Sequence, residues 1–188
     1  MATEYRASTV LLIINSVMYV VTSIFSRNPI MMSERVLTVL GQANSLAVNG
    51  AYWQFITSMF VHADIVHFLG NMVFLTYYGR ASDLVFSKGQ LFTIYLASGL
   101  FGNFLTLFLG PFALSVGASG AIFGIIGAYM AYSGGISPNS MGFALAYSAF
   151  FFLFNIGVGV NLFAHFGGLV AGLLIGYTLS KRSNSVEL

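Results

Sequence analysis

One serine of the chain stands where a nucleophile could work. Ser119 lies in Val-Gly-Ala-Ser-Gly-Ala (116–121), between a proline-containing turn and a long apolar run. If Ser119 opens a helix, the unpaired N–H groups and positive dipole end there would stabilise an oxyanion. The flanking Gly117 and Gly120 would leave room for a substrate. The alternative is an ordinary N-cap serine. The Gly-x-Ser-x-Gly elbow of soluble hydrolases is not matched, because Ala121 occupies its final glycine position.

One histidine could supply the base. His165 lies in Phe-Ala-His-Phe-Gly-Gly (163–168), early in the last apolar run. Small residues then recur on one face of this run and on one face of the run after Ser119: Gly168, Gly172 and Gly176 in the first, Gly120, Gly124, Gly127, Ala128 and Ala131 in the second. Such faces let helix backbones approach closely, which would bring Ser119 and His165 to matching depth for activation of the serine. The alternative for His165 is a packed polar residue bonded to a neighbouring helix.

A second polar pair could stabilise developing negative charge. His67 and Asn71 are four residues apart, so both project from one face of a helix. Their N–H groups suit an oxyanion pocket, and the alternative is hydrogen bonding between helices, worth about 1 kcal/mol in a membrane. A third catalytic member is missing, since no Asp or Glu lies within an apolar run and nothing places Asp64 behind His165. The pattern predicts a Ser–His dyad without the carboxylate of a triad.

A metal site is the competing interpretation of the histidines. His62, His67 and His165 could supply three imidazoles. However, the chain has no His-Glu-x-x-His motif, and its glutamates lie at positions 4, 34 and 187. A metal hydrolase would therefore lack both its histidine pair and its carboxylate base. We expect no metal.

Composition determines where these side chains must work. Of the 188 residues, 57% are hydrophobic and 6% charged, against about 25% charged in a typical soluble domain. The formal net charge of +2 is too small for a nucleic-acid footprint. The absence of cysteine excludes disulfides, thiolate metal sites and a cysteine nucleophile. The chain is predicted to reside in the lipid bilayer.

Gaps between charged residues predict the membrane spans. No charged residue occurs from Gly89 to Ser180, a run long enough for four crossings of about 20 residues each. Aromatic residues around Trp53 place the segment 27–64 at the bilayer interface. The prediction is an all-α polytopic membrane protein, a single domain over 1–188 with six transmembrane helices near 7–26, 65–79, 89–109, 116–133, 141–156 and 161–180.

The distribution of basic residues predicts the orientation. With a cytoplasmic N-terminus, the inner segments carry more Lys and Arg than the outer ones: Arg6, Arg80, Lys88, Lys181 and Arg182 inside, against Arg27 and Arg35 outside. The positive-inside rule then places both termini in the cytoplasm. We expect a multi-pass protein of the plasma membrane.

Three motifs together resemble those of rhomboid intramembrane serine proteases. Residues 117–120 (Gly-Ala-Ser-Gly) are similar to the family's serine motif, and 164–168 (Ala-His-Phe-Gly-Gly) to its histidine motif on the sixth helix. Residues 60–71 resemble the second-helix signature, with His67 and Asn71 at its His-x-x-x-Asn pair. The order of the motifs and the six predicted helices match the minimal bacterial or archaeal form, so the resemblance covers nearly the whole chain.

The resemblance implies a role for each residue. Ser119 would be the nucleophile, His165 the general base and then acid, and His67, Asn71 and the Ser119 backbone N–H the oxyanion hole. Substrates would be single-pass or multi-pass transmembrane proteins, cut near the outer end of a helix through an acyl-enzyme, without cofactor or ATP. The segment 27–64 would be the interfacial first loop, and the fifth helix would be the lateral gate.

Two departures from the family pattern and two rival functions qualify this expectation. The Trp-Arg pair of many members reads Trp53-Gln54 here, and Phe123 replaces an aromatic that is often tyrosine. A catalytically inactive rhomboid-like protein that binds membrane clients would be expected to lack the serine or the histidine, and both are present. A channel or transporter would spread its polar residues along a pore, whereas here they gather near one end of the predicted bundle.

Overall fold

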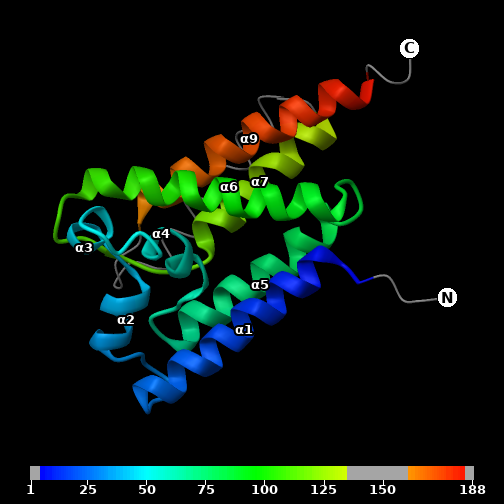
Figure 1. The fold of residues 1–188 in the computed structure, drawn as a ribbon. Helices are drawn as coiled ribbons and strands as arrows, with labels where there is room; N and C mark the ends of the chain where they lie inside the picture. The colour runs from blue at the N-terminus through cyan, green and yellow to red at the C-terminus, as the bar shows by residue number, and fades with distance from the viewer. Residues whose placement is uncertain (1–4, 135–160, 185–188) are drawn as a thin grey trace.

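The computed structural model describes residues 5–134 and 161–184, which are mostly helical. Within these residues, five long helices form the bundle in Figure 1: α1 (Ala7–Ser26), α5 (Ile65–Ser82), α6 (Lys88–Thr106), α7 (Ser119–Gly134) and α9 (Leu162–Asn184). A 3₁₀ turn, η2 (Leu107–Leu109), continues α6. The helix predicted over 141–156 falls outside the described residues.

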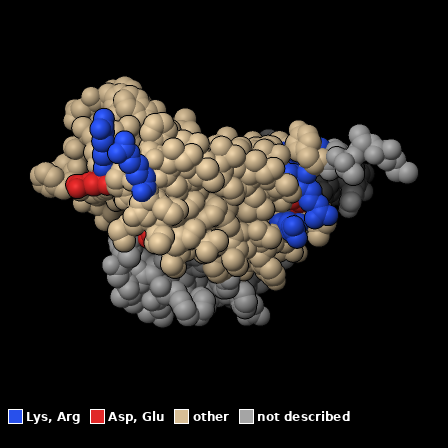
Figure 2. Space-filling view, turned by 90° about the horizontal axis from the view of Figure 1, so that it is seen from below, with Lys and Arg blue, Asp and Glu red and all other residues tan. Residues whose placement is uncertain are grey.

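Three of the described helices are long and apolar enough to cross a membrane: Ala7–Ser26, Lys88–Leu109 and Leu162–Lys181. The apolar part of α7 is shorter and runs from Ser119 to Ser133. Figure 2 shows Lys and Arg gathered at two opposite ends of one face, with an almost entirely uncharged surface between them. Large apolar side chains such as Val17 and Val20 are exposed on α1, as expected for helices that face lipid.

Polar residues set where the helices begin and end. The carboxylate of Asp64 accepts a hydrogen bond from the backbone N–H of His67 at 2.8 Å and caps α5. Ser87 and Gln90 form a reciprocal capping box at the start of α6. At the start of α1, both the hydroxyl and the backbone N–H of Ser8 donate to the carboxylate of Asp83. Both described aspartates therefore act as helix caps, which satisfies N–H groups that a helix start leaves unpaired.

The segment predicted at the bilayer interface has regular structure. It contains α2 (Glu34–Leu40), β1 (Gln42–Ala43), α3 (Asn44–Val48), α4 (Gln54–Thr57) and η1 (Ser58–Phe60). These short elements cluster at one end of the bundle in Figure 1, opposite the start of α1 and the end of α9. β1 pairs antiparallel with β2 (Leu114–Ser115), with Gln42 opposite Ser115. This small sheet is an addition to the predicted all-α fold.

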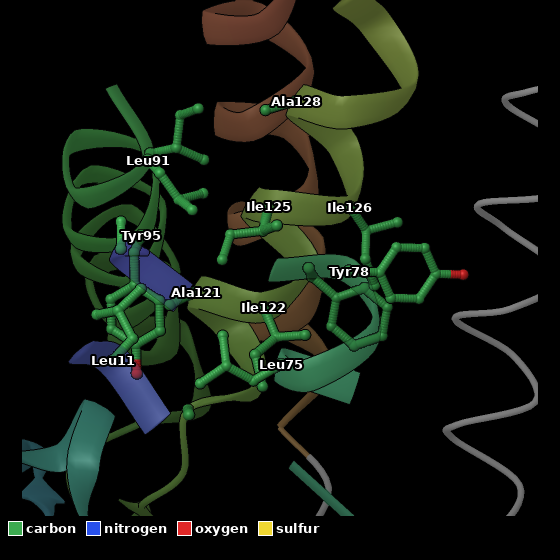
Figure 3. Packing of buried hydrophobic residues seen from close by; sticks show 14 of the residues in the cluster. Leu11, Leu75, Tyr78, Leu91, Tyr95, Ala121, Ile122, Ile125, Ile126 and Ala128 are labelled. Carbon is green, nitrogen blue, oxygen red and sulfur yellow. The ribbon is translucent and has the colours of Figure 1, made fainter. Parts of the chain in front are cut away.

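Helix α7 lies at the centre of the core. It packs against α5, α6 and α9, and Figure 3 shows its isoleucines between Leu75 and Tyr78 of α5 and Leu91 and Tyr95 of α6. On its other side α7 meets α9 through glycines. A Cβ added to a glycine of α9 would lie far inside van der Waals contact with a carbonyl oxygen of α7: 1.9 Å for Gly168 and Gly120, 2.0 Å for Gly172 and Gly124, 2.2 Å for Gly176 and Ala128. The predicted contact between two glycine-lined helices is confirmed.

Candidate active site

The sequence around Ser119 folds into a turn that ends at a helix N-terminus. After β2, Gly117 adopts a φ of +124°, a conformation that suits glycine because it lacks a Cβ. Its N–H donates to the carbonyl oxygen of Ser58 at 2.9 Å. The chain therefore enters α7 only at Ser119, three residues later than the predicted start at 116. Ser119 is partly buried and lies in the first turn of the helix.

His165 lies in the first turn of α9, beside this serine. Its Nε2 atom is 2.8 Å from the Oγ of Ser119, within hydrogen-bond distance. The imidazole is 8% exposed, and the Phe123 ring packs against it with centroids 4.5 Å apart and planes inclined by 39°. Phenylalanine, at the position where tyrosine is common in the family that the motifs resemble, keeps the ring contact. The structure thus brings Ser119 and His165 together in the geometry that activation of a serine requires.

His67 faces the same place from α5. A Cβ added to Gly117 would lie 2.7 Å from the Nε2 atom of His67 and 3.7 Å from the Oγ of Ser119. The missing side chain of Gly117 therefore leaves a point within hydrogen-bond distance of the His67 ring and next to the serine oxygen. An oxygen atom at this point could accept a hydrogen bond from His67, as an oxyanion pocket requires.

Asn71 is buried one helical turn beyond His67. Its Nδ2 atom donates to the carbonyl oxygen of His67 at 2.8 Å, and its Oδ1 atom has no partner among the described residues. An amide nitrogen carries two hydrogens. One of them bonds to the His67 carbonyl within the same helix, and the second remains for another acceptor. The structure places Asn71 behind His67, with no hydrogen bond to Ser119 or His165.

The third histidine, His62, belongs to the same region but makes no metal cluster. Its ring is fully buried and meets the ring of His67 edge-on, with centroids 5.2 Å apart. Burial, assisted by the neighbouring His67, lowers the pKa of His62 to about 3, so this side chain is neutral at physiological pH. Within the part of the chain that the structure describes, no three His, Cys, Asp or Glu residues are placed to hold a metal ion.

Two polar residues with several hydrogen-bond partners were missed by the sequence analysis. Asn161 precedes α9, and its side chain bonds to three other segments. Gln54 was noted only as a departure from a Trp-Arg pair, yet its amide is 1% exposed. Its nitrogen donates to the carbonyl oxygens of Thr38 and Val39, and its oxygen accepts from the N–H of Ala43. An asparagine directly before an apolar run is an N-cap signal that could have identified Asn161.

Comparison with known proteins identifies the family of the chain. A family model described as the Rhomboid domain matches residues 49–182. The chain belongs to the rhomboid family. Among rhomboid relatives, Rhomboid-like protease 3 of Toxoplasma gondii is 32% identical over 171 residues, covering 85% of this chain and 64% of that protein. The putative rhomboid protease YdcA of Bacillus subtilis is 28% identical over 184 residues, covering 95% of this chain and 90% of that protein.

Other rhomboid relatives are considerably longer than this chain. Rhomboid protease GluP of Bacillus subtilis is 30% identical over 148 residues, which cover 74% of this chain and 28% of that protein. The chain spans between 35% and 64% of the length of the first four curated relatives it matches. Membership of the rhomboid family, together with the apolar helices, identifies the chain as a polytopic membrane protein.

Proposed function

We propose that this rhomboid is an intramembrane serine endopeptidase that hydrolyses peptide bonds of transmembrane substrates through a Ser119–His165 dyad. The observation that carries the proposal is the 2.8 Å separation of Ser119 Oγ and His165 Nε2 at the N-termini of α7 and α9. Relatives named as proteases, such as GluP and Rhomboid-like protease 3, support the same class of reaction. The presence of both dyad residues argues against a catalytically inactive, client-binding rhomboid.

The proposed reaction begins with proton transfer between the paired side chains. His165 Nε2 takes the proton of Ser119 as Oγ attacks the substrate carbonyl carbon, and a tetrahedral intermediate forms. The resulting oxyanion occupies the space beside Gly117, where it accepts hydrogen bonds from His67 Nε2 and the backbone N–H of Ser119, with Asn71 supporting the pocket. His165 then gives the proton to the leaving amine, which leaves an acyl group on Ser119.

Hydrolysis of the acyl-enzyme completes the cycle. A water molecule gives a proton to His165 and attacks the acyl carbon, and collapse of the second intermediate returns the proton to Ser119. The described carboxylates of Asp64 and Asp83 cap α5 and α1, so the proposed mechanism assigns no proton to them. It uses neither a metal ion nor a cofactor.

The remaining features of the proposal follow from the family and the charge pattern. We place the single domain 1–188 in the plasma membrane with six transmembrane helices and both termini in the cytoplasm. Substrates are single-pass or multi-pass membrane proteins with a helix that unwinds locally at the cleavage site. Small or helix-breaking residues near that site lower the cost of unwinding.

The test is labelling and cleavage by purified protein in liposomes. A fluorophosphonate should label the wild type, and Ser119→Ala should abolish labelling. Ser119→Ala and His165→Ala should each reduce cleavage of a reconstituted transmembrane substrate at least about 1,000-fold, while circular dichroism shows retained helix. Retained cleavage in either variant contradicts the dyad. Binding of the substrate without labelling or cleavage would instead favour the inactive client-binding protein.

A further inference from the structure

Asn161 makes a second polar contact between the two segments that carry Ser119 and His165. Its Nδ2 atom donates to the Oγ of Ser115 at 2.8 Å. Asn161 precedes His165 by four residues, and Ser115 precedes Ser119 by four residues. The bond between Asn161 and Ser115 therefore runs beside the bond between His165 and Ser119, in the same register of the two segments.

The same amide also holds the end of α6. Asn161 Nδ2 donates to Thr106 Oγ1 at 2.6 Å, and Thr106 is completely buried. The backbone carbonyl of Thr106 in turn accepts a hydrogen bond from Asn44 of the interfacial segment at 2.9 Å. Both N–H groups of Asn161 are thus committed to hydroxyls on elements that are far from it in the sequence.

The remaining oxygens of Asn161 organise the helix that carries the base. The Oδ1 atom accepts a hydrogen bond from the N–H of Ala164 at 3.0 Å, which makes Asn161 the N-cap of α9. Its backbone carbonyl accepts from the N–H of His165 at 3.1 Å. One residue therefore joins the first turn of α9, the strand that leads to Ser119 and the end of α6.

We propose that Asn161 is a positioning residue that sets the separation of Ser119 and His165, an inference that rests on the proposed function. In a serine protease triad a carboxylate orients the histidine, but both described aspartates here are helix caps. The orientation of His165 then depends on where the first turn of α9 begins, and Asn161 fixes that point relative to Ser115. The glycine contacts farther along α7 and α9 set the distance between the helices, and Asn161 sets their register at the dyad.

A simple N-cap would explain only part of this arrangement, and the two roles separate by substitution. In Asn161→Ser the hydroxyl still caps α9, because serine is as good an N-cap as asparagine, but it is too short to reach Thr106 and Ser115. Ser115→Ala removes the contact from the opposite side and leaves the cap of α9 untouched. The control is Ser87→Ala, which removes the cap of α6 at the end of that helix remote from Thr106.

The experiment measures the rate of fluorophosphonate labelling and the thermal unfolding midpoint of each full-length variant in one detergent. Asn161→Ser and Ser115→Ala should each label about 10- to 100-fold more slowly than the wild type at a temperature where they are folded. The double variant should be no slower than Asn161→Ser alone, since that change already breaks the contact with Ser115. Ser87→Ala should label at the wild-type rate. Labelling of Asn161→Ser at the wild-type rate overturns the proposal.

A spectroscopic measurement separates this inference from the proposed function. The ¹⁵N chemical shift of the His165 ring reports its bond to Ser119 whether or not the protein cleaves anything. A change of that shift in Asn161→Ser and Ser115→Ala, but not in Ser87→Ala, supports positioning even if the wild type is not labelled. If the wild type is labelled but the shift is the same in Asn161→Ser and Ser115→Ala as in the wild type, the positioning role alone is overturned.

Discussion

At their glycines α7 and α9 meet backbone to backbone, whereas buried amide side chains make several of the contacts that hold the interfacial segment from Gln42 to Ser58. A Cβ on Gly172 would lie 2.0 Å from the carbonyl oxygen of Gly124. In the interfacial segment, the fully buried amide of Gln42 reaches the backbone of Asn103 at 2.9 Å. The contact at Gly172 leaves no room for a side chain, and the contact at Gln42 is made by a side chain.

The two kinds of contact differ in the substitutions that they tolerate. A backbone contact cannot move aside, so any added atom between α7 and α9 forces the helices apart. An amide contact loses hydrogen bonds when its side chain is removed, but the backbone around it is free to take up water. Substitutions should therefore disrupt the glycine contact by addition and the interfacial segment by deletion.

The largest effect on stability is expected in the glycine contact. Gly172→Ala places its Cβ against the carbonyl oxygen of Gly124 and should cost about 3 kcal/mol, at the upper end for overpacking because backbone cannot rotate away. Thermal unfolding in detergent measures the loss. The matched control is Gly70→Ala in α5, where nothing lies within 4 Å of the added Cβ and alanine is the better helix former. Equal stability of the two variants would contradict the proposed rigidity.

The next effect concerns activity at the junction of the two regions, where Gly117 bonds to Ser58 and leads into α7. Gly117→Ala fills the space beside His67 and should lower cleavage and labelling about 100-fold, as loss of an oxyanion donor does. Gly50→Ala is a matched control, because Gly50 has a φ of +122° but nothing within 4 Å of its added Cβ. Both variants carry the same backbone strain. A similar loss of rate in Gly50→Ala would show that strain, not the filled space, is responsible.

A smaller effect is expected for deletion within the interfacial segment. Gln54→Ala removes the hydrogen bonds that the side chain makes to the carbonyl of Thr38 and the N–H of Ala43, and should cost about 1–2 kcal/mol. Because the loss is local, hydrogen exchange of the amides around Ala43 should accelerate while those of α7 and α9 remain protected. Gln90→Ala, at the exposed capping box of α6, is the control. Uniform acceleration over α7 and α9 would show that the two regions unfold as one.

The smallest effect is a pH dependence at His62, the last buried side chain before α5. Burial holds the pKa of His62 near 3, below the value of about 6.5 expected for an unfolded chain. As the pH falls below 6.5, only the unfolded state takes up this proton, so stability decreases. Between pH 8 and pH 5.5 the decrease attributable to His62 is about 1.4 kcal/mol. His62→Phe should lose that much less than the wild type. An identical pH profile would mean that His62 is hydrated or partnered when folded.

Local sequence patterns predicted the glycine contact between α7 and α9 but not the buried hydrogen bonds of the interfacial segment. Ser119, His165 and the four-residue glycine spacing lie within short stretches, so their shared helix faces follow from helical periodicity. The predicted start of α7 was wrong by three residues. The turn at Gly117 depends on a hydrogen bond to the Ser58 carbonyl, which lies far away in the sequence. Gln42 and Gln54 look like ordinary polar loop residues, and their burial arises only from partners in other elements.

The candidate site shows the same division. The distance between Ser119 and His165 agrees with the prediction because the serine and histidine motifs each fix their own helix position. The two hydroxyl partners of Asn161 could not be anticipated, since hydrogen-bond partners more than 40 residues away leave no trace in spacing. The catalytic roles of Ser119, His165, His67 and Asn71 remain predictions.

The contact between α7 and α9 has a mechanical consequence. Because backbone meets backbone at the glycines, that part of the interface holds no rotamers that could change when the surrounding bilayer thins or thickens. Mismatch with the lipid must then be absorbed by tilting of peripheral helices such as α1. Helices α7 and α9, which carry Ser119 and His165, would then move as one rigid body. The distance between the two side chains would not change when the membrane deforms.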